Sequence, residues 1–139
     1  MAARVCSLVL LLLMVVLPLG ACKKDEQATA TMAELSALTD QLVTTVRDAP
    51  DKKAGVAEAQ ALLDERRQAL ATKLAALGQL KSIELSDEAQ AAVLNTSTDA
   101  MAKMARLEEE LLAEIFEDEA LEAALETLIE DHEALVKGR

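Results

Sequence analysis

The chain has 139 residues, a formal net charge of −11 and a single aromatic residue, Phe116. This acidic balance argues against binding to nucleic acid or to an anionic membrane surface, since both need clustered lysine and arginine. The shortage of aromatic residues argues against a deep small-molecule pocket, because ligand sites and interface hot spots are usually rich in aromatic side chains.

The first 22 residues have the organisation of an export signal. Arg4 precedes an apolar stretch at residues 5–17, which suits a signal-peptide core and falls short of the roughly 20 apolar residues of a membrane-spanning helix. Pro18 then disfavours further helix, because its ring clashes with the preceding turn and it has no N–H donor. The order of these features predicts a cleavage site shortly after Pro18.

The four residues after Pro18 resemble the lipobox of bacterial lipoproteins: Leu19, Gly20, Ala21 and Cys22. The resemblance implies that residues 1–21 are a cleaved signal peptide and that Cys22 carries the lipid that holds the protein on a membrane. Lys23 stands where lipoproteins kept in the inner membrane of enterobacterial-type cells have Asp. It therefore favours the outer membrane, with the protein facing the periplasm.

Two other interpretations of this N-terminal region stay open: an ordinary secretory signal cut after Ala21, or an uncleaved membrane helix from Val5 to Ala21. Under the lipoprotein interpretation, residues 22–30 form a lipid-anchored polar tether, because they lack apolar periodicity. The only other cysteine, Cys6, leaves with the signal, so no thiol remains for a disulfide or a metal.

Residues 31–139 are predicted to be an all-α domain, because their apolar residues recur at three- and four-residue steps. The first helix should begin at Thr31, which with Glu34 fits a capping box, and should end before Pro50. A second helix is expected from about Asp51 to Leu77. The two apolar stripes are Met32, Leu35, Leu38, Leu42 and Val46, then Val56, Ala59, Leu63, Leu70, Leu74 and Leu77.

A third helix should start at Ser86, a good N-cap residue, and carry Ala89, Val93, Ala100, Met104, Leu107 and Leu111. The last apolar seam consists of Leu121, Leu125, Leu128, His132 and Leu135. Extending this seam backwards would bury carboxylates, so a break near Asp118 is favoured over one long bent helix. The predicted fold is a small antiparallel helical bundle of three to four helices behind a cleaved signal peptide.

Acidic residues dominate the C-terminal part, since no Lys or Arg occurs between Arg106 and Lys137. A solvated face, a docking surface for a basic partner and a cation site all fit this pattern. The cation site is the weakest, because Ca²⁺ needs six to eight converging oxygens and the i,i+4 pair Asp118 and Glu122 offers two side chains. The acidic residues proposed to contact a partner are Glu108, Glu109, Glu119, Glu122, Glu126 and Glu130.

No motif for catalysis, a cofactor or a metal cluster is present in the sequence. His132 lies on the apolar seam, so partial burial is favoured over a role as a pH switch. The favoured hypothesis is a non-catalytic, lipid-anchored envelope protein that binds another envelope protein or serves as a structural accessory. The alternative is an envelope cation or ligand sensor that uses the acidic face and His132.

Overall fold

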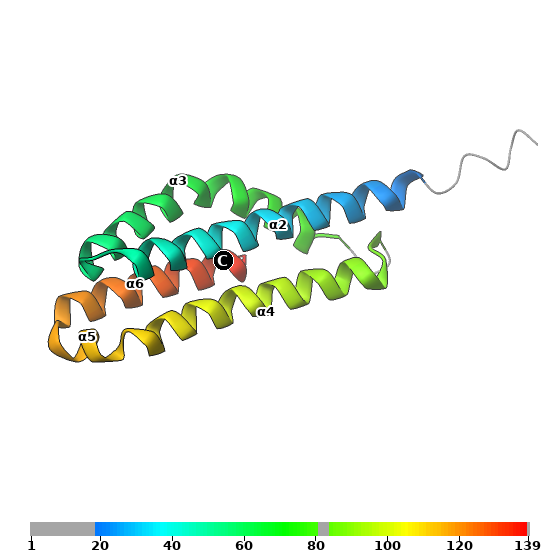
Figure 1. The fold of residues 1–139 in the computed structure, drawn as a ribbon. Coiled ribbons are helices and arrows are strands. Elements are labelled where there is room, and N and C mark those ends of the chain that lie inside the picture. The colour runs from blue at the N-terminus through cyan, green and yellow to red at the C-terminus, as the bar shows by residue number, and fades with distance from the viewer. Residues whose placement is uncertain (1–18, 81–83, 139) are drawn as a thin grey trace, which may run out of the picture.

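The computed structural model describes residues 19–80 and 84–138, with side chains from residue 23 onward. These described residues form five α-helices and no strand (Figure 1), which confirms the all-α prediction for this part of the chain. Residues 1–18 of the predicted signal peptide lie outside the described residues. The helices are α2 (Leu19–Asp48), α3 (Lys52–Gly78), α4 (Asp87–Glu110), α5 (Leu112–Glu117) and α6 (Glu119–Val136).

Four long helices form the bundle, in which α2 and α6 each pack against both α3 and α4 (Figure 1). Helix α2 runs parallel to α4, because Asp40 pairs with Lys103 and Arg47 pairs with Glu110 further along both helices. The antiparallel prediction is correct for α2 with α3 and for α4 with α6. It is wrong for α2 with α4 and for α3 with α6, because α4 packs mainly beside α2 and α6 and not beside the preceding helix α3 (Figure 1).

The core consists of the predicted apolar stripes. On α6 the buried residues are the five seam positions: Leu121, Leu125, Leu128, His132 and Leu135. All five stripe residues of the first predicted helix are also buried, whereas Leu74 of the second and Val93 of the third are only partly buried. Helical periodicity therefore identified the inward faces correctly.

Helix α2 begins earlier than predicted. Residues 22–30 belong to this helix, so the prediction of a non-helical tether followed by a cap at Thr31 is wrong. Ala28 is 1% exposed in the core, and the Thr31 hydroxyl donates to the carbonyl of Gln27 at 2.9 Å. Tertiary packing stabilises helical turns that lack an apolar stripe of their own.

None of the helices in the described ranges combines the length and the hydropathy needed to span a bilayer. This applies to α2 although it is 30 residues long, because it is rich in polar residues.

The predicted cap at Ser86 and the break before α6 are present, and Asp51 is a further cap that was not predicted. Asp51 and Ser86 accept hydrogen bonds from Ala54 and Ala89, each at 3.1 Å, at the starts of α3 and α4. The Asp118 carboxylate accepts from the backbone N–H groups of Ala120 at 2.9 Å and Leu121 at 3.1 Å, so it caps α6. These bonds satisfy amides that a helix start leaves without partners.

Gly55 permits a close approach between α2 and α3 beside their connection. A Cβ atom at this position would lie 2.5 Å from the Cβ of Ala49 and 3.1 Å from the carbonyl oxygen of Thr45. The glycine therefore serves packing here, although it weakens the first turn of α3.

Candidate functional site

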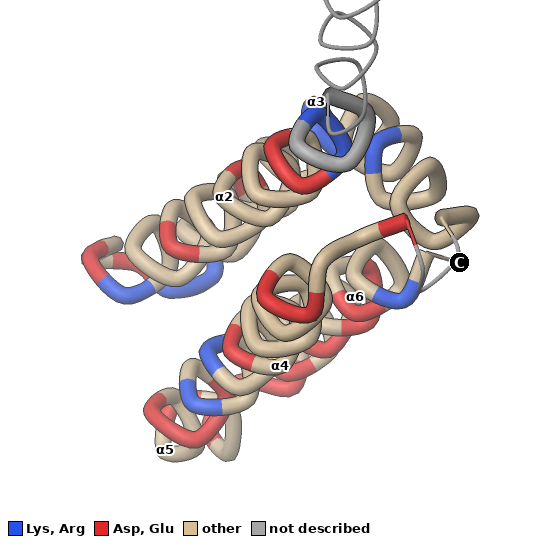
Figure 2. The backbone as a smooth tube through the Cα atoms, turned by 90° about the vertical axis from the view of Figure 1, so that its right-hand side faces the viewer, with Lys and Arg blue, Asp and Glu red and all other residues tan. Residues whose placement is uncertain are grey.

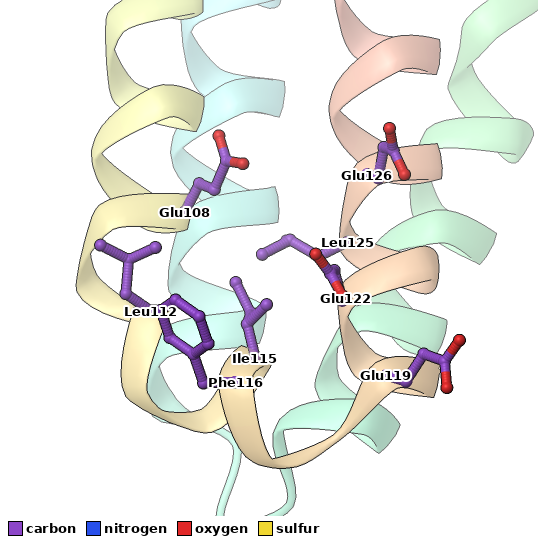
Figure 3. A pocket seen from close by; sticks show the side chains of 8 residues that line it. All are labelled: Glu108, Leu112, Ile115, Phe116, Glu119, Glu122, Leu125 and Glu126. Atoms are coloured by element: carbon purple, nitrogen blue, oxygen red, sulfur yellow. The ribbon is translucent and has the colours of Figure 1, made fainter.

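A pocket of about 350 Å³ lies where α4, α5 and α6 meet (Figure 3). Half of its lining is apolar and half is acidic: Leu112, Ile115, Phe116 and Leu125, with Glu108, Glu119, Glu122 and Glu126. The buried Leu125 forms the floor, whereas Phe116 is 88% exposed. The pocket thus extends from the buried side chain of Leu125 to the exposed side chain of Phe116.

The short helix α5 brings Phe116 to the surface. Leu111 is still buried, but the helix breaks there and resumes as α5, none of whose residues is buried. Leu112 and Phe116 are four residues apart and therefore share one side of α5. Leu112 is also about half exposed, so α5 holds two large apolar side chains outside the core.

The four carboxylates of the pocket take part in no ion pair with any described residue. Other acids of the same region are neutralised, since Glu110 pairs with Arg47 and Asp131 with Arg67. Hydrogen bonds from Arg47 hold the pKa of Glu110 below its usual value. Acidic positions predominate along α6 in Figure 2.

Four of the six predicted partner-binding acids come together in this pocket. Glu109 and Glu130 are exposed but do not line it. Phe116 was not among the predicted site residues, although one signal for it was available: this large apolar residue stands in an acidic stretch that has no apolar stripe. The backbone of residues 19–22, which resemble a lipobox in sequence, lies in the first turn of α2, at the other end of the bundle (Figure 1).

His132 does not belong to the acidic face. Its side chain is 1% exposed in the core, with Nε2 at 2.9 Å from Oγ1 of Thr39. The Thr39 hydroxyl donates its proton to the carbonyl of Leu35 at 2.9 Å, so His132 must be the donor in the bond between the two side chains. Burial lowers the pKa of His132 to about 4. His132 therefore lies apart from the acidic face with which the sensor hypothesis combined it.

Within the described ranges, no three or more His, Cys, Asp or Glu side chains are grouped so that they could hold a metal ion. The chain matches no protein-family model, no curated protein and no solved structure. Its candidate site consequently has to be judged on its own chemistry.

We expect salt to stabilise the bundle gradually if the carboxylates of α4 to α6 are solvated. Their mutual repulsion opposes folding, and about 0.1 M NaCl screens charges beyond roughly 10 Å. Melting temperatures measured over an NaCl series should rise smoothly, and CaCl₂ at matched ionic strength should have nearly the same effect. A saturating, Ca²⁺-selective rise that Asp118→Asn with Glu122→Gln removes would instead reveal a specific cation site.

Proposed function

We propose that this chain is a lipid-anchored protein of the bacterial cell envelope, and that its helical bundle is a non-catalytic module that binds another envelope protein. The lipobox-like residues Leu19 to Cys22 support the anchor, and Lys23 favours the outer membrane. The pocket at the α4–α5–α6 corner supports the binding role.

The exposure of Phe116 is the observation that carries the binding role. The side chain is 88% exposed although it is the largest apolar residue of the chain. A large aromatic group beside the buried Leu125 gives a partner both a surface to cover and a pocket to fill. Aromatic residues in such positions commonly supply most of the binding free energy of an interface.

Helix α2 would separate this surface from the membrane. Cys22 lies in its first turn, and Arg47, near its last residue, pairs with Glu110 beside the start of α5. At 1.5 Å per residue, the helix between these two positions is roughly 40 Å long. A lipid on Cys22 would therefore leave Phe116 pointing into the periplasm, where another protein can reach it.

Replacing Cys22 with Ala should abolish lipid attachment, because the thiol is the group that receives the lipid in the lipoproteins that this region resembles. Metabolic labelling with a radioactive fatty acid should mark the wild-type protein and leave Cys22→Ala unlabelled and uncleaved. Equal labelling of the two proteins would contradict the anchor.

Site-specific photocrosslinking in living cells tests the binding role. A photoreactive amino acid at Phe116 should capture one defined protein, and the same probe at Glu119 should capture that protein too. Leu94 provides the matched control, since it is 68% exposed on α4 and does not line the pocket. Capture from Leu94 as efficient as from Phe116 would show that the surface is not a specific binding site.

A further inference from the structure

We infer that the pocket receives a basic amphipathic helix of the partner protein, with one large apolar side chain inserted between α4 and α6. This inference rests on the proposed binding function and adds the chemistry of the ligand. Two independent features of the pocket carry it, namely its apolar floor and the arrangement of its carboxylates.

The size of the pocket fits one side chain better than a whole small molecule. Its volume of about 350 Å³ is near the lower end of ligand pockets, which span roughly 300–1,000 Å³. Leu125 and Ile115 point into the space between α4 and α6, and Leu112 and Phe116 lie at its side (Figure 3). An inserted Leu or Phe would contact all four apolar groups.

The carboxylates lie on both sides of this space. Glu119, Glu122 and Glu126 are spaced i, i+3 and i+7, so they follow one face of α6. Glu108 stands opposite them on α4 (Figure 3). A helix lying in this groove would meet negative charge along both edges, which favours Lys and Arg beside its apolar anchor.

A second copy of this chain is a poor occupant. In a two-fold symmetric dimer the same patch of both subunits would meet, which brings the four glutamates of one copy against those of the other. Like charges facing each other across an interface cost free energy. No basic residue lines the pocket to offset them, so charge complementarity selects a cationic partner.

Three synthetic helices test this inference on the full chain, purified in a non-ionic detergent. The first is an alanine-based peptide with lysines along two edges and one central Phe. The second has Ala in place of that Phe, and the third has Glu in place of every Lys. Binding of the fluorescently labelled peptides is measured by anisotropy at low salt and again at about 0.3 M NaCl.

We expect the Phe-containing lysine peptide to bind with a micromolar Kd. Removing its Phe, or making Phe116→Ser in the protein, should weaken binding about tenfold or more, because the buried apolar contact is lost. Leu94→Ser is the matched control and should bind like the wild type. Glu119→Gln with Glu122→Gln and Glu126→Gln should weaken binding several-fold and reduce its salt dependence.

A second triple variant controls for net charge: Glu26→Gln, Glu58→Gln and Glu65→Gln, three exposed positions outside the pocket. Equal weakening by the two triple variants, equal binding of the peptide without Phe, or binding of the Glu peptide would each overturn the inference. So would a stable dimer of the wild-type chain that Phe116→Ser dissociates. Far-ultraviolet circular dichroism of each variant checks that it is folded.

The crosslinking and peptide experiments together separate a failure of the proposed binding function from a failure of the inferred ligand chemistry. If Phe116 captures a defined protein in cells but no lysine peptide binds, the chemistry inferred for the ligand is wrong and the binding role stands. If the lysine peptide binds as expected but Phe116 captures no defined protein in cells, the groove has the inferred preference and the proposed cellular role is wrong.

Discussion

Replacing Leu63 with Asp should unfold the bundle. Leu63 is 0% exposed in the middle of α3, so the substitution removes a buried apolar side chain and places a carboxylate in the core. The lost packing alone costs about 2–5 kcal/mol, and the unpaired charge adds to it. This sum approaches the whole stability of a typical domain, about 5–15 kcal/mol. Circular dichroism at 25 °C should show loss of most of the helical signal.

Leu94→Asp is the matched control, because the same change is made on the exposed surface of α4. Leu94 is 68% exposed, so its substitution should change the free energy of unfolding by no more than about 0.5 kcal/mol. A Leu63→Asp protein that melts cooperatively near the wild-type temperature would show that α3 does not pack through this face.

Local rules predicted the helices and their inward faces well. The cap at Ser86 and the break at Asp118 depend on single residues and the turn that follows them, so they could be predicted from the sequence. The apolar stripes could be predicted equally well, because the helical repeat places every third or fourth residue on one face.

Features that depend on distant parts of the chain could not be read in this way. The extension of α2 through residues 22–30 depends on Ala28 entering the core, and on contacts with the segment before α4. Asp25 accepts a hydrogen bond from the backbone N–H of Ser86 at 3.0 Å, and Lys24 forms an ion pair with Glu84. None of these contacts leaves a pattern within the local sequence.

Only part of the candidate site could be predicted, because the rest of it also depends on contacts between distant parts of the chain. Its glutamates were conspicuous as a run without Lys or Arg, but their grouping around an apolar pocket depends on α4 and α6 lying side by side. The break at Leu111, which turns Phe116 outward, has no Gly, Pro or side-chain cap to mark it. The charge composition therefore predicted the acidic surface. The pocket in that surface depends on how the helices pack, so it could not be predicted.

The buried His132 should make the bundle less stable between pH 6.5 and pH 4. Its pKa is lowered to about 4 in the folded protein, against about 6.5 in the unfolded chain. Well above pH 6.5 the imidazole is neutral in both states, so His132 does not lower the free energy of unfolding there. As the pH falls from 6.5 towards 4, only the unfolded chain binds the proton, and the free energy of unfolding should drop by about 2–3 kcal/mol.

The variant His132→Gln isolates this effect, because its amide can still donate to Thr39 but cannot titrate. Urea unfolding at pH 7 and pH 4.5 should show that the wild type loses about 2–3 kcal/mol more than His132→Gln. The carboxylates titrate in both proteins, so their contribution cancels in the comparison. The same loss in both proteins would mean that His132 becomes protonated without unfolding, which would require water or a counter-charge to reach the pair that it forms with Thr39.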